Sequence, residues 1–328
     1  MSAKRFGDYY KINGRILQYH YKNHLSDFKD WIQKKHAQDW LLYPQNIGTY
    51  LSLDETSLSN GELYTILTNK NAQGKKGSIV AIVKGTRAID VINILNKIPL
   101  ERRNVVEEVT VDMAGSMNLI AKKCFPKTEI VTDRFHVQKL ASEAVQEERI
   151  RLRWEIIEQE NRDILEAREK GNTYKYELLG NGDTHKQLLA RSRYLLFKSK
   201  TKWTVRQRER AEILFKLYPT IEKAYNLAQG LTYIFENNTH KDVARLKLAH
   251  WYDKVEKSQF KSFSTIARSI QMHYVPILNY FNNRSTNASA ESFNAKIKEF
   301  RAQFRGVRDV KFFLYGLTKL FAELGLLP

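Results

Sequence analysis

Short apolar runs separated by turn residues dominate the chain between residues 49 and 83. The three runs extend from Thr49 to Leu53, from Leu63 to Leu67 and from Ser78 to Val83. Runs of this length, bounded by glycine, asparagine and other turn residues, are typical of strands. The pattern therefore predicts three consecutive antiparallel strands.

The next fifty residues alternate between helical and strand-like patterns. Residues 89–98 carry apolar side chains at helical spacing, and residues 105–111 form the apolar-rich run that is typical of a buried strand. A short helix is then predicted over residues 119–124, and a last strand over residues 130–132. The predicted order is strand, strand, strand, helix, strand, helix, strand.

Beyond His136 every predicted element is a helix. Residues 137–170 combine many charged side chains with spaced apolar positions, which predicts a long, solvated amphipathic helix. Further helices are predicted over residues 188–197, 207–217, 221–235, 241–255, 262–272, 290–300 and 310–324. We therefore expect four parts: an approach segment (residues 1–48) with one helical pattern over residues 24–36, the first part of an α/β core (49–136), an all-helical insertion (137–284) and C-terminal helices that complete the core (285–328).

The chain is strongly basic. It contains 54 Lys and Arg residues against 36 Asp and Glu residues, which gives a formal net charge of +18. This charge favours a polyanionic partner such as nucleic acid, and a basic protein without such a partner is the alternative. The single cysteine, Cys124, excludes an internal disulfide and a cysteine-rich zinc site. Because there is also no long apolar stretch, we expect a cytoplasmic, nucleoid-associated protein.

Two aspartates stand where predicted strands end. Asp54 follows the first strand and Asp112 follows the fourth. With this element order the first and fourth strands lie side by side in parallel, about 4.8 Å apart, so the two carboxylates would face each other. Carboxylate oxygens suit Mg²⁺, and two such ions can hold the attacking and leaving oxygens of a phosphoryl transfer. Glu291, near the start of a predicted helix, is the candidate third ligand.

A purely structural interpretation of these acidic residues stays open. Aspartate is common at strand ends as a turn or cap residue. Glutamate near the start of a helix complements the helix dipole. The three residues together, on a matching strand order, favour the metal site.

Four blocks of the sequence resemble the DDE transposases of bacterial insertion sequences, most closely the ISL-three group. They are Leu53–Thr56, Val111–Met113, Asp133–Val137 and Ala290–Lys298. The resemblance implies an α/β fold with a ribonuclease H-like mixed sheet that a large all-helical insertion interrupts. It also implies that Asp54, Asp112 and Glu291 bind two Mg²⁺ ions, for which Mn²⁺ would substitute.

The third block matches the Asp-x-x-His signature of transposases that have a helical insertion. The resemblance makes Asp133 and His136 candidate auxiliary residues. In the functional interpretation, His136 hydrogen-bonds Asp133 or a scissile phosphate. In the alternative, it is a half-buried histidine beside a capping aspartate.

Two basic segments are candidates for contact with DNA. Residues 194–210 interleave aromatic with basic side chains, which is typical of a phosphate-binding face, although a solvated charged face is the alternative. Trp203 in this segment is either a base-stacking or a core residue. The candidate DNA-binding residues are Lys198, Lys200, Lys202, Trp203 and Arg206 here, and Asn294, Lys296, Lys298 and Arg301 on the helix of Glu291.

The predicted function is therefore transposition by metal-dependent DNA cleavage and strand transfer. The expected partners are double-stranded DNA, as transposon ends and target, and further copies of the chain. A ribonuclease H-like nuclease that cuts without joining and a non-catalytic or decayed DNA-binding protein are the alternatives. Family members that act alone usually carry an N-terminal zinc-binding and helix-turn-helix region. Only about fifty residues, without cysteine, precede Asp54. We thus expect a separately encoded end-recognition module or a truncated copy, and DNA binding with little sequence preference.

Overall fold

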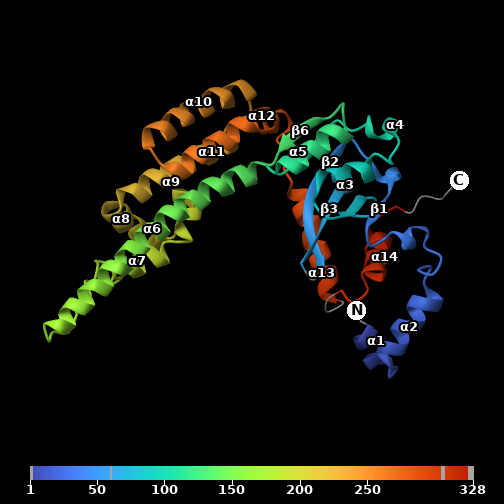
Figure 1. The fold of residues 1–328 in the computed structure, drawn as a ribbon, viewed down its shortest axis with the longest axis horizontal. Helices are drawn as coiled ribbons and strands as arrows, with labels where there is room; N and C mark the ends of the chain where they lie inside the picture. The colour runs from blue at the N-terminus through green and yellow to red at the C-terminus, as the bar shows by residue number, and fades with distance from the viewer. Residues whose placement is uncertain (1–2, 60, 304–306, 324–328) are drawn as a thin grey trace. The chain divides into compact units, whose positions relative to one another are not determined.

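The computed structural model describes residues 3–59, 61–303 and 307–323, and the chain folds into two compact units (Figure 1). The first, here called the sheet unit, comprises residues 1–133 and 285–328. The second, the helical unit, comprises residues 134–284. The sheet unit is therefore built from two segments that are far apart in the sequence.

A six-stranded mixed sheet forms the centre of the sheet unit, in the order β1-β4-β3-β2-β5-β6. The strands are β1 (Trp40–Leu42), β2 (Tyr50–Ser59), β3 (Glu62–Asn69), β4 (Ile79–Lys84), β5 (Glu108–Val111) and β6 (Glu129–Thr132). The first four pair antiparallel, whereas β2 pairs with β5, and β5 with β6, in parallel. The predicted meander and the parallel pairing of its first strand with the next predicted strand are confirmed.

Helices cover both faces of this sheet. They are α3 (Ala88–Leu95), α4 (Leu100–Arg103) and α5 (Gly115–Cys124), and after the helical unit α13 (Ala288–Gln303) and α14 (Val310–Phe321). Leu51 and Leu53 of β2 pack with α3 and α5, whereas Leu58 packs with α13 and α14. Because side chains alternate along a strand, the even-numbered positions of β2 face α13. Polar residues occupy positions 52, 54 and 56 of this row.

The N-terminal segment differs from the prediction. It forms α1 (Ala3–Tyr10) and α2 (Gly14–His20), and β1 joins the edge of the sheet. The single helix predicted over residues 24–36 is wrong, because these residues form a π-helical turn (Tyr21–Leu25) and a 3-10 turn (Ile32–Lys35). Their aromatic residues pack against α14 instead of forming one helix face. Strand β1 has three residues, which is too short for an alternating pattern to appear.

Every regular element of the helical unit is a helix. The helices are α6 (Arg134–Glu169), α7 (His185–Arg191), α8 (Val205–Leu217), α9 (Pro219–Glu236), α10 (Lys241–Ser258), α11 (Lys261–Met272) and α12 (Tyr274–Asn283), with short 3-10 turns at Leu195–Phe197 and Lys200–Lys202. Helix α6 packs against α7, α9 and α11, and α10 packs against α9, α11 and α12. The predicted all-helical character is confirmed. Helix α12 was not predicted. Its Pro276 usually signals a break in a helical pattern, but it lies in the first turn, where proline is tolerated.

The chain therefore has the predicted α/β fold, a ribonuclease H-like mixed sheet with a helical insertion between β6 and α13. Leu324, the last residue of the predicted C-terminal helix, lies outside the described residues. None of the helices in the described ranges combines the length and the apolar character that crossing a membrane requires.

Candidate active site

Asp54 lies within β2 rather than at its end. The strand continues to Ser59 because residues after Asp54 still pair with β3, so the predicted strand end at Leu53 is wrong. The parallel pairing of β2 with β5, however, covers only Tyr50 to Ser52. Asp54 therefore lies just beyond the point where β2 and β5 separate.

The strand register brings Asp54 and Asp112 to the same end of the parallel pair. Ser52 pairs with Thr110 in the parallel ladder, and β5 ends at Val111. Two residues further along both chains, Asp54 and Asp112 follow this ladder at the same end of the parallel pair. Both side chains are half-buried. Asp54 on β2 and Asp112 directly after β5 are therefore both available at this end of the sheet.

Hydrogen bonds orient both carboxylates. Asp54 accepts the backbone N–H of Glu55 through Oδ1 and the Nδ2 amide of Asn294 through Oδ2, each at 2.8 Å. Asp112 accepts the backbone N–H of Ala114 through Oδ1, also at 2.8 Å. A carboxylate oxygen has two acceptor sites, so accepting a hydrogen bond does not by itself prevent it from binding a cation.

The charge around Glu55 shows that acidic groups are concentrated here. Burial, followed by the negative charges of Asp112 and Asp54, raises the pKa of Glu55. Like charges within a few ångströms disfavour ionisation, and a divalent cation relieves this repulsion. The donor chemistry of the site therefore fits a hard cation such as Mg²⁺.

Helix α13 carries Glu291, and hydrogen bonds connect the chain to β2 on both sides of Glu291. Asn287, fully buried just before the helix, accepts a hydrogen bond from the Ser52 hydroxyl. Asn294 donates to Asp54. Positions 287, 291 and 294 are four and three residues apart, so they share one helix face. Glu291 therefore lies on the face of α13 that contacts β2, with its side chain exposed.

The three predicted metal ligands do not converge on one point. Among the described residues, no three carboxylate, cysteine or histidine side chains lie close enough together to hold a metal ion. The structure brings Asp54 and Asp112 to the same end of the parallel pair and Glu291 to the adjoining helix face.

The candidate auxiliary residues occupy different compact units. Asp133 follows β6 and is fully buried, and its backbone N–H donates to the Val111 carbonyl at 2.9 Å. Because Val111 pairs with Thr132, position 133 lies opposite position 112 in the β5–β6 register. His136 is half-buried in the first turn of α6, within the helical unit.

Three candidate DNA-binding residues make contacts inside the fold. Trp203 is 9% exposed, and its indole N–H donates to the Leu195 carbonyl at 2.8 Å. Its core interpretation is therefore correct and the base-stacking one is wrong. Asn294 bonds Asp54, and the Lys296 amine donates to the Gly74 carbonyl at 2.7 Å.

The remaining candidates lie at the surface. Exposed side chains belong to Lys198, Lys200, Lys202, Arg206 and Lys298, and Arg301 is half-buried. Lys200 also lies over two aromatic rings, with its amine 5.6 Å from the ring centre of Phe215 and 5.9 Å from that of Tyr225.

Comparison with known proteins relates most of the chain to transposases. The family model of the ISL-three DDE group, described as "Transposase", matches residues 51–316. The transposase for insertion sequence element IS1001 of Bordetella parapertussis is 22% identical over 274 residues, which cover 83% of this chain and 61% of that relative. The chain thus spans about three fifths of the length of this relative. The family match extends from β2, which carries Asp54, into α14, and on this evidence the chain belongs to the ISL-three family of DDE transposases.

Proposed function

We propose that this chain cuts DNA strands and joins them to target DNA by phosphoryl transfer at Asp54, Asp112 and Glu291. The observation that carries the proposal is the parallel register of β2 and β5, because Asp54 on β2 and Asp112 just after β5 each follow its last pair, Ser52 and Thr110, by two residues. The hydrogen bond from Asn294 adds the helix of Glu291 to the same site. The name of the relative, a transposase for an insertion sequence, supports the same reaction.

The donor set suits two Mg²⁺ ions, for which Mn²⁺ substitutes because both accept oxygen ligands in octahedral geometry. Asp54 and Asp112 would hold them, and Glu291 would complete the set. When bound, such ions stabilise the charge that develops on the attacking and leaving oxygens.

The chain's own residues orient these ligands. The Ala114 backbone holds Asp112, and the Asn294 amide holds Asp54. Asn294 is thus a positioning residue, in place of its predicted contact with DNA. We assign auxiliary roles to Asp133 and His136. The reason for Asp133 is its position beside Asp112 in the register of β5 and β6.

Double-stranded DNA is the proposed partner, held in part by the exposed basic residues. These are Lys198, Lys202 and Arg206 of the helical unit and Lys298 of α13. Arg301 on the same helix as Lys298 is half-buried, and the Lys200 amine already lies over aromatic rings. We also propose that residues 137–284 form the helical insertion and that several copies of the chain assemble on DNA.

Charge-removing variants test the metal site. Asp112→Asn, Asp54→Asn and Glu291→Gln should each lower cleavage and strand transfer at least about a hundredfold, because each removes a ligand. Calorimetry with Mn²⁺ gives a readout that does not depend on turnover, and binding should be lost with activity. Glu299→Gln, an exposed change on the same helix, should leave both unchanged.

Two results would contradict the proposal. If a variant cuts DNA at the rate of the wild type, the substituted residue is not a metal ligand. If the wild-type protein binds no Mn²⁺, the chain is instead a non-catalytic DNA-binding protein. A DNA substrate with a pre-cut end separates joining from cleavage, since a nuclease that cannot join leaves this substrate unchanged.

A further inference from the structure

The N-terminal helices precede the residues of the family match and form a tightly packed hairpin. A Cβ atom at Gly7 would lie 2.4 Å from the Ile12 carbonyl oxygen, and one at Gly14 would lie 2.7 Å from that of Ala3. Both distances are too short for any side chain, so glycine lets the two helix backbones touch. The Asn13 side chain caps α2 by accepting the backbone N–H of Arg15 at 2.9 Å.

Ion pairs and aromatic rings connect the segment after the hairpin to α14. Lys22 pairs with Asp309, and the Lys319 amine lies 2.7 Å from the Asp27 carboxylate. The ring of Phe28 lies 5.1 Å from that of Phe312. These contacts hold the hairpin beside the start of α14.

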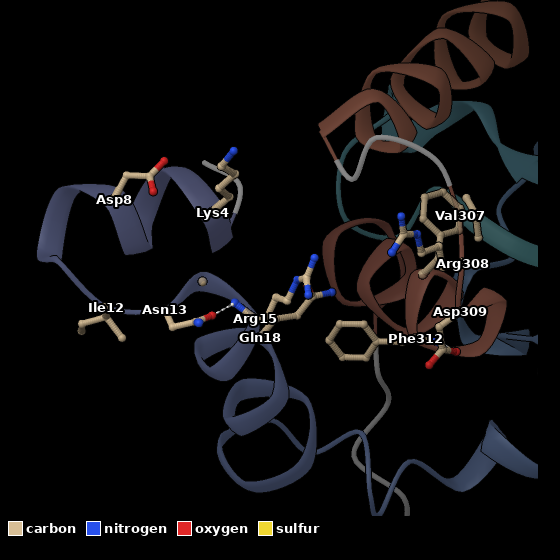
Figure 2. Close-up of a pocket in the computed structure, with 12 residues that line it drawn as sticks. Lys4, Asp8, Ile12, Asn13, Arg15, Gln18, Val307, Arg308, Asp309 and Phe312 are labelled. Atoms are coloured by element: carbon tan, nitrogen blue, oxygen red, sulfur yellow. Dashed lines mark hydrogen bonds between the residues drawn. The ribbon is translucent and has the colours of Figure 1, made fainter.

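A cavity of about 650 Å³ lies between the hairpin and the start of α14. Three basic side chains, Lys4, Arg15 and Arg308, contribute to its lining. Figure 2 shows Arg15 and Arg308 reaching into the gap from opposite sides, near the ring of Phe312. The cavity therefore has a basic rim and an apolar wall.

The two carboxylates in the lining do not neutralise the arginines. Asp309 already pairs with Lys22 and accepts the backbone N–H of Phe312 at 3.0 Å. Asp8 lies on the far part of α1, away from Arg308 (Figure 2). Within the described ranges, neither guanidinium forms an ion pair with a carboxylate. The cavity thus has a surplus of donors for an anion.

We propose that this cavity binds a backbone phosphate of DNA between Arg15 and Arg308. The planar guanidinium matches phosphate oxygens in a two-pronged geometry, and two arginines on opposite walls can hold one phosphate from both sides. Exposed Tyr9, Tyr10 and Lys11 on the same hairpin supply the aromatic and basic surface that nucleic-acid strands use. The choice of DNA as the polyanion rests on the proposed function.

This contact fixes the position of DNA without reading its sequence. Removing it should therefore weaken binding equally for unrelated sequences. Loss of one phosphate contact should lower the salt slope of log affinity by about 0.9. Between about 50 and 200 mM salt, wild-type protein should thus lose about 3.5-fold more affinity than the variant.

The test is fluorescence anisotropy of the full chain with DNA duplexes of about 30 base pairs at several salt concentrations. The probe proteins are wild type, Arg15→Ala/Arg308→Ala and the control Lys122→Ala/Lys123→Ala, which removes two exposed charges from α5. EDTA in the buffer makes the result independent of the proposed metal site, whose own test is cleavage. Matching circular dichroism and melting temperatures establish that the variants fold.

A reduced slope in the arginine variant alone supports the proposal. An unchanged slope overturns it. If calorimetry shows that inorganic phosphate binding is lost in the variant while the DNA slope is unchanged, the cavity takes a free anion instead. If the arginine variant differs from the wild type only in the molecular mass measured by light scattering, the cavity lies in an interface between copies of the chain. The assignment to DNA is then wrong.

Discussion

Asn294 shows how a single side chain connects the candidate catalytic helix to the central strand. Its Nδ2 lies 2.8 Å from Asp54 Oδ2 and 3.4 Å from the Glu55 carbonyl oxygen. A neutral amide stabilises an ionised carboxylate without adding positive charge that would compete with a metal ion. The side chain therefore fixes one oxygen of Asp54.

The Asn294→Asp variant tests this role. It replaces a donor with a second carboxylate beside Asp54, so repulsion should lower the melting temperature of the metal-free protein. Because a bound cation offsets that repulsion, Mn²⁺ should restore more of the stability in this variant than in the wild type. Differential scanning fluorimetry with and without Mn²⁺ measures both effects.

The matched control is Gln303→Glu, the same amide-to-carboxylate change at an exposed position of α13. Its melting temperature should not respond specifically to Mn²⁺. An Asn294→Asp variant with the same metal response as this control would show that Asn294 does not act through Asp54.

At the scale of elements, one carboxylate joins two helices of the helical unit. Asp183 precedes α7, and its side chain is 2% exposed. One oxygen pairs with Arg191 of α7, and the other lies 3.1 Å from Nε of Arg210 in α8. Burial by itself would raise the pKa of Asp183, but the hydrogen bonds and charges of Arg210 and Arg191 outweigh it and lower the pKa.

Asp183→Ala should therefore destabilise the helical unit by about 2 kcal/mol at neutral pH, because it removes the charge-assisted hydrogen bonds of a buried carboxylate to two arginines. A carboxylate whose pKa is lower in the folded state stabilises the fold above its unfolded pKa. This stabilisation is lost as the pH falls through the folded-state pKa. Urea unfolding from neutral pH down to about pH 3 should show a shallower acid dependence in the variant.

Glu166→Ala provides the control for Asp183. Its pair with Lys170 is exposed on α6, and such pairs contribute less than about 1 kcal/mol. Equal losses of stability in the two variants would mean that the Asp183 pairs do not connect α7 and α8 energetically.

At the scale of the whole molecule, the net charge of +18 is distributed over both units. The candidate DNA-binding face of the helical unit contains Lys198, Lys202 and Arg206 as exposed cations. Lys200 differs, because its amine lies over aromatic rings that already stabilise it. Three of the four residues therefore remain available for phosphate.

Replacing Lys198, Lys200, Lys202 and Arg206 with alanine should weaken DNA binding uniformly across sequences. Three lost phosphate contacts would lower the salt slope by about 2.7. Anisotropy titrations over a range of salt concentrations measure this slope, with Lys122→Ala/Lys123→Ala as the control. The same slope in the quadruple variant and the wild type would show that this segment is only a solvated surface.

Local pattern was sufficient for much of the architecture. Strand order, the helical character of residues 134–284 and the positions of Asp54 and Asp112 relative to predicted strands depend on contiguous residues. The register of β2 and β5, in contrast, is known only from the structure. The motifs around these residues also indicated the family that the comparison shows.

Contacts between segments far apart in the sequence set which polar residues support the site and which basic residues are exposed. Asn294 and Asp54 are 240 positions apart, and Asn287 and Ser52 are 235 apart. Trp203 is buried because α8, α9 and the Leu195 carbonyl meet around it. The spacing of apolar residues along the chain predicts which face of a helix or strand is buried. The partner of a polar side chain, however, depends on packing between distant segments. The sequence alone therefore indicated five of the six strands of the described sheet and the acidic residues near them, and the packing of α13 on β2 determined how those residues are held.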